Sequence, residues 1–568
     1  MMNSTPTETT LTDAVHTWAL RQPTAKIASE YRAQGHWRDT TIVDDILSMA
    51  KAHPRRAAIV AYRKGSAVPE TITYGQLNAL VERAALALIE LGVEANDVVS
   101  LQMPNGWEFA VAALAAARAG AVVNPLVTIF RRRELEFMLS RAGSKVLIVE
   151  ESFRGFNHAE LALDLRRTLP SLEHVVVARG VAYGGALSFE EQFLHSEANR
   201  ATDTAAILAD RRRSCDDIAS LIYTSGTTGE PKGTLHSYNT LWSAGRAVFD
   251  NLSLGSDDVS FMASPVGHLT GYLWGMLHPL SRGMTAVFQD VWHPGGFLDL
   301  IDVEGITWTI GATPFVVDAV EEQIRSPRSF ASLRTFVCAG APISPALAPR
   351  AASELGAQLL AQWGTSECGG VTVHHPSDDV ETVCSSDGRP IGFMALKIVD
   401  DAGNPVPLGT EGRLIVRGPS VFVGYLGRGD LYDDVVDPDG WFDTGDLGIE
   451  HSDGTVRITG RAKDIIIRGG ENIPVVEIEN LLLTHPGIRE VAVIGLPDER
   501  LGERGCAVIV PRNEAPGLPE LLKYLDEHGT AKQYWPEHLV VVDEMPRTPS
   551  GKIQKFRLRE LATAKPDR

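Results

Sequence analysis

The segment Tyr223–Gly233, YTSGTTGEPKG, gathers residue types that can bind a phosphate group. Its hydroxyls, glycines and one lysine are Thr224, Ser225, Gly226, Thr227, Thr228, Gly229, Lys232 and Gly233. Glycines let successive backbone N–H groups converge on an anion, and the lysine adds a mobile positive charge. The segment therefore predicts a phosphate-binding loop, with a solvated Gly/Thr turn as the alternative. It is not a Walker A loop, since Pro231, Lys232 and Gly233 stand where that motif needs Gly-Lys-Ser/Thr.

Three further segments carry single groups that could act on an anion or a metal ion. Glu367, in QWGTSE, offers the hard carboxylate oxygen that Mg²⁺ takes alongside phosphate oxygens; its alternative is a surface carboxylate. Asp446 lies in a Thr-Gly-Asp turn, which taken alone is usually just a turn. Lys552 lies in the Pro/Ser/Gly-rich segment TPSGKIQK, where an isolated lysine is usually a surface residue.

These groups must be positioned by alternating strands and helices. Strand-like apolar runs are AAIVAY (57–62), DVVSLQM (97–103), AVVNPL (121–126) and KVLIVE (145–150). Helix-like amphipathic runs between them are YGQLNALVERAALALIELG (74–92), EFAVAALAAARAG (108–120) and ELEFMLSRAG (134–143). Alternation of this kind predicts parallel α/β layers. Short strands at GRLIVRG (412–418) and GTVRITG (454–460) predict a smaller β-rich portion before the C-terminal part.

The chain is expected to divide near Gly460–Asp464. Its 568 residues exceed what one hydrophobic core supports, so at least two domains are needed. We expect a loosely held arm over residues 1–40, a large α/β domain with a β-rich subdomain over 41–460, and a small, mobile α+β domain over 461–568. The last of these has the size of an ordinary domain.

Composition limits the class of protein. The chain is 44% hydrophobic and 22% charged, as in ordinary globular proteins, and its net charge is −19. This charge argues against binding to nucleic acid or to an anionic membrane, although a local cluster of donors could still hold ATP. The most apolar stretch, Phe109–Val127, contains Arg118 and Asn124, so we interpret it as a buried helix running into a strand and expect no membrane span.

The cysteines and the N-terminus favour a reducing compartment. Cys215, Cys338, Cys368, Cys384 and Cys506 form no CxxC pair and no zinc pattern, so free thiols are expected. The N-terminal segment is polar and acidic and does not have the form of a signal peptide. We therefore expect a cytoplasmic protein.

The phosphate-binding segment resembles the signature of the acyl-adenylate-forming superfamily, which includes acyl-CoA synthetases, firefly luciferase and peptide-synthetase adenylation domains. Further segments match family motifs in the family's order: SPVGHLTGYLWG (264–275), CAGAPIS (338–344), QWGTSE (362–367), GWFDTGDLG (440–448), GRAKDIIIRGGENI (460–473) and PRTPSGKIQKFRLRE (546–560). The match extends from about residue 40 to the end of the chain.

The resemblance implies a binding site for ATP and Mg²⁺. Thr224 and Glu367 would hold the metal ion, and Lys232 and the loop after Thr224 the phosphates. Asp446 and Arg461 would bind the ribose. The other implied nucleotide-binding residues are Gly340, Ala341 and Pro342 against the adenine, with Gln362, Trp363, Gly364, Thr365 and Ser366. Trp363 could instead be a core residue, and both interpretations stay open.

The resemblance also implies two half-reactions. Lys552 would bridge the carboxylate of the acid and the α-phosphate during adenylation, because a positive charge lowers the cost of bringing two anions together. His268 would lie beside the acyl group, although a lone histidine is more often structural; His236 is expected to be structural. The C-terminal domain would then rotate about Lys463 and bring Gly469, Gly470 and Glu471 to the path of coenzyme A.

Within the superfamily, ENIPVVEIEN (471–480) and YRAQGHWRDTTIVDDI (31–46) are similar to cyclohexanecarboxylate-CoA and medium-chain acyl-CoA ligases. An alicyclic, bulky or medium-chain acid is therefore expected. Glycines near the acyl group could widen its pocket or could serve backbone turns: Gly267, Gly271, Gly275, Gly364, Gly369 and Gly370.

Three other functions stay open. The enzyme could stop at the adenylate and pass the acyl group to a carrier protein or a partner enzyme. It could be a luciferase-like oxygenase, which shares the nucleotide motifs. It could also be a non-catalytic acyl- or nucleotide-binding regulator, against which the set Lys232, Glu367, Asp446, Arg461 and Lys552 argues.

Overall fold

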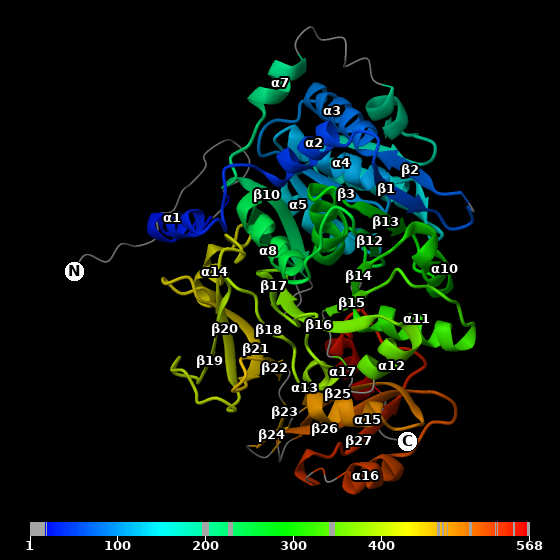
Figure 1. The fold of residues 1–568 in the computed structure, drawn as a ribbon, viewed down its shortest axis with the longest axis vertical. Helices are drawn as coiled ribbons and strands as arrows, with labels where there is room; N and C mark the ends of the chain where they lie inside the picture. The colour runs from blue at the N-terminus through cyan, green and yellow to red at the C-terminus, as the bar shows by residue number, and fades with distance from the viewer. Residues whose placement is uncertain are drawn as a thin grey trace, which may run out of the picture.

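A computed structural model describes most of the chain (Figure 1). The described residues are 18, 20–66, 68–195, 204–224, 231–339, 343, 347–462, 466–468, 471–473, 475–498, 502–528, 530, 532–548 and 551–564. In the view of Figure 1, the blue to green elements form the upper body, the yellow strands lie at the left, and the orange and red C-terminal elements lie below.

The first sheet is mainly parallel and supplies several candidate site residues from its strand ends. Its strands β2, β17 and β18 are antiparallel to their neighbours. The spatial order is β18 (Arg389–Pro390), β17 (Gly369–Val373), β16 (Gln358–Thr365), β15 (Thr335–Ala339), β14 (Trp308–Gly311), β12 (Val259–Met262), β13 (Thr285–Gln289), β1 (Ala57–Tyr62), β2 (Glu70–Thr73).

A second sheet carries the predicted phosphate-binding segment at one edge. It is parallel except for the pairing of β11 with β10. The spatial order is β11 (Lys232–Ser237), β10 (Ile218–Thr224), β4 (Val122–Pro125), β3 (Val98–Gln102), β5 (Ser144–Glu150), β8 (His174–Ala178), β9 (Leu187–Ser188). A short hairpin, β6 (Ser152–Phe153) and β7 (Phe156–Asn157), follows β5.

Helices form layers on and between these two sheets. The helices α3 (Tyr74–Glu90) and α4 (Trp107–Arg118) pack together, and α4 contacts both β1 of the first sheet and β3 and β4 of the second. The helices α5 (Arg132–Ala142) and α6 (His158–Thr168) pack on the second sheet, and α11 (Thr313–Arg325) and α12 (Leu347–Leu355) on the first. The result confirms the predicted α/β layering.

The remaining helices of this part are α1 (Ala25–Ala33), α2 (Ile42–Ala52), η1 (Glu190–Leu194), α7 (Thr204–Asp210), α8 (Tyr238–Asn251), η3 (Thr270–Leu277), α9 (His278–Ser281), α10 (Pro294–Glu304), α13 (Val380–Ser385) and α14 (Gly429–Val435). Local sequence sets several of their ends. The helix α3 begins with a capping box, in which Thr73 and Gln76 satisfy each other's backbone N–H groups. The helix α5 ends at Gly143, whose φ of 56° gives the left-handed cap that glycine favours.

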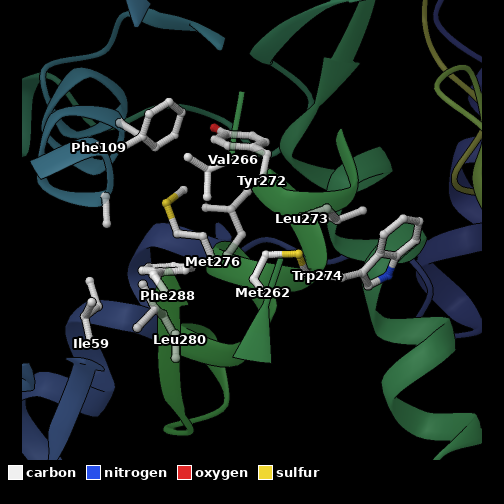
Figure 2. Packing of buried hydrophobic residues seen from close by; sticks show 14 of the residues in the cluster. Ile59, Phe109, Met262, Val266, Tyr272, Leu273, Trp274, Met276, Leu280 and Phe288 are labelled. Atoms are coloured by element: carbon white, nitrogen blue, oxygen red, sulfur yellow. The ribbon is translucent and has the colours of Figure 1, made fainter. Parts of the chain in front are cut away.

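A cluster of buried hydrophobic side chains fills the space between the two sheets (Figure 2). Phe109 of α4 faces Tyr272 and Val266, and Met262 and Met276 lie below them. The interpretation of 109–127 as a buried helix running into a strand is confirmed, since α4 is followed directly by the buried strand β4. No helix among the described residues combines the length and apolarity needed to cross a membrane.

Two smaller sheets follow the α/β body. The first is antiparallel and confirms the predicted β-rich portion: β19 (Ala395–Val399), β20 (Gly412–Arg417), β21 (Phe442–Glu450), β22 (Val456–Arg461). The second belongs to the C-terminal α+β domain: β24 (Glu471–Ile473), β23 (Ile466–Arg468), β26 (Gly502–Pro511), β25 (Ile488–Asp498), with β27 (His538–Val541) beside β26. Its helices are α15 (Val475–Leu483), α16 (Leu518–Glu527), η5 (Lys532–Tyr534) and α17 (Lys555–Ala564).

The expectation of a loosely held arm over residues 1–40 is wrong from residue 18 on. Trp18, Leu20 and Trp37 are buried, and the Trp37 indole donates to Pro419 O at 2.9 Å. Arg21 N also donates to Val423 O at 2.8 Å. The buried tryptophans hold this N-terminal segment on the rest of the protein, because burying a tryptophan removes a large apolar area from water. Residues 1–17 lie outside the described part of the chain.

Candidate functional site

The predicted phosphate-binding segment begins and ends in a β-hairpin. Thr224, the last residue of β10, pairs directly with Lys232, the first residue of β11. The Thr224 hydroxyl lies 3.5 Å from Lys232 O. Ser225, Gly226, Thr227, Thr228 and Gly229 lie outside the described residues. Antiparallel pairing therefore brings the first hydroxyl and the lysine of the motif together, although seven residues separate them in the sequence.

Glu367 follows the end of β16 and is held by a residue that sequence reasoning missed. The Tyr425 hydroxyl donates to Glu367 Oε1 at 3.0 Å, and Lys232 Nζ lies over the Tyr425 ring, 5.2 Å from its centroid. Burial and the nearby Glu367 carboxylate raise the pKa of Tyr425. In the sequence, Tyr425 is marked only by its position beside a glycine in VFVGYLG, and nothing in that segment indicates that Glu367 is its partner.

Asp446 and Arg461 are brought together as the resemblance implies. The two residues are direct partners of β21 and β22, and Arg461 Nε lies 2.9 Å from Asp446 Oδ1. Trp363 donates through Nε1 to Asp446 Oδ2 at 2.9 Å. Of the two interpretations left open for Trp363, these contacts support the core residue: it is partly buried and packs on the core of the β-rich sheet, and its indole also orients this carboxylate.

The same carboxylate provides a test of whether a nucleotide fits. Asp446 is 3% exposed, and its Oδ1 accepts no hydrogen bond from any described residue in spite of the nearby Arg461. A buried carboxylate oxygen without a donor is costly, and a vicinal pair of sugar hydroxyls supplies such donors. Gln362 Oε1 is likewise buried without a hydrogen-bond partner in the described part of the chain. Both oxygens can still accept hydrogen bonds, which fits a bound nucleotide.

The segment between Gly364 and Glu367 is tightly fixed. A Cβ on Gly364 would lie 1.8 Å from Gly369 O, so only glycine allows this close backbone approach. The Thr365 hydroxyl accepts from Glu367 N at 3.2 Å. Ser366 O is 2.7 Å from His236 Nε2, whose ring also contacts Thr240 Oγ1 at 3.1 Å. This arrangement agrees with a structural His236, whose pKa burial lowers to about 4.

Lys552, in the C-terminal domain, acts electrostatically on His268 of the α/β body. Burial, together with the positive charge of Lys552, lowers the pKa of His268 to about 4. His268 Nδ1 accepts from Thr270 N at 3.3 Å, so the neutral ring carries its proton on Nε2. The lysine loop is closed by Thr548, whose hydroxyl accepts from Lys552 N at 3.0 Å and whose N donates to Lys552 O at 2.7 Å.

The loop that carries Lys552 rests against the start of α11, the helix that follows β14 of the first sheet. A Cβ on Gly551 would lie 3.5 Å from Ala312 Cβ and 3.7 Å from Pro314 Cγ, at the start of α11. Gly551 also has a φ of 86°, which disfavours other residues. Nearby, Arg512 of the C-terminal domain lies 3.5 Å from Glu321 of α11. The C-terminal domain thus places the loop of Lys552 against the α/β body in this structure.

The glycines near the proposed acyl site do not widen a pocket. A Cβ would lie 2.5 Å from Leu126 O at Gly267, 2.3 Å from Pro265 O at Gly271 and 2.5 Å from Met262 Cγ at Gly275. Gly369 has a φ of 64° and approaches Ala244, and Gly370 approaches Gln362. The sequence left open a wide pocket or backbone turns. The contacts show close packing instead, and of these glycines only Gly369 has the left-handed φ of a turn.

Several predicted residues lie outside the described part of the chain. They are Gly340, Ala341, Pro342, Lys463, Gly469 and Gly470, whereas Glu471 begins β24.

The cysteines are free, as expected, and burial raises the pKa of Cys215 to about 11 and of Cys338 and Cys368 to about 12. Within the described ranges, no cluster of His, Cys, Asp and Glu side chains could by itself hold a metal ion.

Known proteins resemble this chain over nearly its whole length. The family model for AMP-binding enzymes matches residues 48–426, and the model for the AMP-binding enzyme C-terminal domain matches residues 477–552. The medium-chain fatty-acid–CoA ligase of Escherichia coli (strain K12) is 35% identical and covers 93% of this chain and 92% of its own length.

Two further relatives have different acyl acceptors in their names. The salicyl-AMP ligase / salicyl-S-ArCP synthetase of Mycobacterium tuberculosis is 33% identical, over 93% of this chain and 92% of that protein. The crystal structure of the anthranilate CoA ligase AuaEII in complex with anthranoyl-AMP superposes with a TM-score of 0.82 at 26% identity, covering 93% of this chain and 98% of that one.

Proposed function

The chain belongs to the AMP-binding enzyme family, and from that premise we propose that it joins a carboxylic acid to coenzyme A through an acyl-adenylate. The observation that carries the proposal is the position of the loop that holds Lys552: a Cβ on Gly551 would lie 3.5 Å from Ala312 Cβ, at the start of α11. It brings a cation of the C-terminal domain to the α/β body, where the positive charge of Lys552 and burial together lower the pKa of His268. An ordinary nucleotide-binding module has no need of this second cation.

In the first half-reaction, a carboxylate oxygen of the acid attacks the α-phosphorus of ATP, and pyrophosphate leaves. Lys552 lowers the repulsion between the two anions, and Lys232 with Thr224 and the adjoining loop binds the phosphates. Asp446 and Arg461 bind the ribose, and Gly340, Ala341 and Pro342 contact the adenine. Neutral His268 lines the acyl side and transfers no proton.

Glu367 and Thr224 are the proposed ligands of a Mg²⁺ ion. Glu367 Oε1 is occupied by the Tyr425 hydroxyl, whereas Oε2 accepts no hydrogen bond within the described residues and remains available to a cation. Mg²⁺ commonly takes one or two protein oxygens together with phosphate oxygens, which fits this small ligand set. When bound, the ion neutralises charge on the phosphates.

In the second half-reaction, the thiol of coenzyme A attacks the acyl carbon and AMP leaves. Lys552 and a thiol cannot approach the same atoms together, so we propose that the C-terminal domain turns about Lys463 between the two steps. Gly469, Gly470 and Glu471 then line the thiol's path. The proposed division is an N-terminal segment over 1–40, held to the body from residue 18 on, an adenylating domain over 41–460 and a lid over 461–568. The two family matches fall on either side of residue 460.

The proposed substrate is a medium-chain, alicyclic or bulky acid. It is supported by the name of the Escherichia coli relative and by the subgroup motifs at 31–46 and 471–480. A carrier protein is the second candidate acceptor, because the relative from Mycobacterium tuberculosis is named for both an adenylate and a carrier-bound product.

Pyrophosphate release with ATP and Mg²⁺ tests the proposal across linear, aromatic, alicyclic and polycyclic acids, with and without coenzyme A. We expect acid-dependent release and an acyl-CoA product by mass spectrometry. Accumulation of acyl-AMP in the presence of coenzyme A would move the search to a carrier protein. Nucleotide binding without release for any acid would support a regulator, and oxygen uptake or light would support an oxygenase.

A further inference from the structure

Glu367 is fixed from the 421–426 segment at two points. Its backbone O accepts from Phe422 N at 2.7 Å, and its side-chain Oε1 accepts from the Tyr425 hydroxyl at 3.0 Å. A carboxylate on a turn otherwise has several rotamers, and ordering it costs entropy. The two contacts select one orientation of this side chain before any ligand arrives.

Tyr425 also contacts the cation of the phosphate-binding segment. Lys232 Nζ lies over its ring at 5.2 Å from the centroid, within the range of a cation–π interaction. The Tyr425 hydroxyl thus contacts the Glu367 carboxylate, and the face of its ring contacts the Lys232 ammonium. These are the two groups of opposite charge that the proposed reaction needs at the phosphates. Tyr425 thereby sets the position of Lys232 relative to Glu367.

The position of Tyr425 is itself rigid. The side chain is 3% exposed, and its ring packs against Phe422 at a centroid distance of 4.7 Å. The flanking backbone is tied to β11, because Leu235 N donates to Gly424 O at 2.9 Å and Leu426 N donates to Gly233 O at 2.8 Å. The rigidly held Tyr425 hydroxyl therefore determines the orientation of the Glu367 carboxylate, which is the more flexible of the two groups.

We infer that Tyr425 is a positioning residue, which aims the Glu367 carboxylate at the metal–phosphate site through its hydroxyl and seats the Lys232 ammonium on its ring. The inference rests on the proposed function, since it takes Glu367 as a metal ligand and Lys232 as a phosphate ligand. Residues that orient metal ligands commonly contribute about 10- to 100-fold to metal affinity or activity.

Packing alone is the competing explanation, and the chain offers a matched control for it. Tyr432 belongs to the same aromatic group, with its ring 5.0 Å from that of Phe422, but its hydroxyl faces Arg21 O at 3.5 Å. Tyr425→Phe and Tyr432→Phe remove the same atom from the same cluster. Only the first removes a contact to Glu367.

The test measures binding of an ATP analogue with a non-cleavable α,β-methylene bridge by calorimetry, in Mg²⁺ and in EDTA. We expect Tyr425→Phe to reduce the Mg²⁺-dependent gain in affinity about tenfold and to leave the affinity in EDTA unchanged. Tyr425→Leu, which also removes the ring, should lower the affinity in EDTA as well. Tyr432→Phe should bind as the unaltered protein does in both buffers, and melting temperatures verify that each variant is folded.

Equal Mg²⁺-dependent gains for Tyr425→Phe and the unaltered protein would overturn the inference, and so would an equal loss in Tyr432→Phe. Glu367→Gln separates this failure from failure of the proposed function. If Glu367→Gln loses the Mg²⁺-dependent gain while Tyr425→Phe keeps it, Glu367 is a metal ligand and only the role of Tyr425 is wrong. If Glu367→Gln keeps the gain, or the unaltered protein has none, the proposed metal site is wrong and the inference falls with it.

Discussion

Arg461 Nε lies 2.9 Å from Asp446 Oδ1 across the last pair of strands before the C-terminal domain. The carboxylate is buried, and its other oxygen accepts from the Trp363 indole. Arg461 is the final residue of β22, and the proposed hinge residue Lys463 stands two positions later in the chain. The proposed ribose site therefore adjoins, along the chain, the place where the C-terminal domain is proposed to turn.

Asp446→Asn should raise the KM for ATP about tenfold or more and leave the KM for the acid unchanged. The amide loses the negative charge that attracts ribose hydroxyls and Arg461, and hydrogen bonds to charged groups contribute roughly 1.5–3 kcal/mol. Steady-state pyrophosphate release with each substrate varied in turn measures this. Asp433→Asn, which alters the exposed ion pair with Arg21, is the control and should change neither KM. A matching rise in the KM for the acid would contradict a ribose-specific role.

Lys552→Ala should lose adenylation by about 10²-fold or more and still convert supplied acyl-AMP to thioester. The reason is that Lys552 serves only the step in which two anions meet. Acid-dependent pyrophosphate release and thioester formation from synthetic acyl-AMP are measured in parallel. Lys555→Ala removes a neighbouring lysine that pairs with Glu479 at 2.7 Å, and it should keep adenylation. Equal loss of both half-reactions in Lys552→Ala would rule out the two-position assignment.

Lys463→Pro should give the reverse pattern. Proline fixes φ near −65°, which restricts the rotation proposed for the second half-reaction. We expect acid-dependent pyrophosphate release to persist and thioester formation from acyl-AMP to fall. The same two assays decide the outcome, and a variant that loses adenylation while keeping thioester formation would place the hinge elsewhere.

Acid should destabilise the protein through its buried histidines. Burial and the charge of Arg282 lower the pKa of His278 to about 3, and burial lowers that of His236 to about 4. The unfolded chain binds protons near pH 6.5 and the folded one does not, so this stability is complete above pH 6.5 and is lost as the pH falls toward the folded pKa values. His278 alone accounts for about 2 kcal/mol between pH 7 and pH 5.

Urea denaturation at pH 7 and pH 5 measures this dependence. His278→Gln keeps a donor for Leu241 O but removes the titrating ring, which stacks on Trp242. The variant should be less stable at pH 7 and should lose less stability on acidification than the unaltered protein does. An unchanged difference between the two pH values would mean that His278 is not the group that takes up the proton.

The sequence was sufficient for the layers and for the local parts of the site. Alternating strand-like and helix-like runs predicted β1, α3, β3, α4 and β4 to within a few residues. A helix buried on one face has a periodic apolar pattern, and a fully buried strand is a short continuous apolar run. The hairpin that joins Thr224 to Lys232 is local because the two residues lie close together in the sequence. Family motifs supplied Asp446, Arg461 and Lys552, which no periodicity could have singled out.

Only the tertiary structure decided which of these residues meet. Tyr425 lies 58 residues after Glu367, and Asp446 lies 83 residues after Trp363. The glycines at 267, 271 and 275 permit close packing, and the expected arm is anchored by Trp18 and Trp37. A residue's type and spacing record whether it is buried or polar. They do not record its distant partner, because that partner is chosen by how whole strands and helices pack against one another.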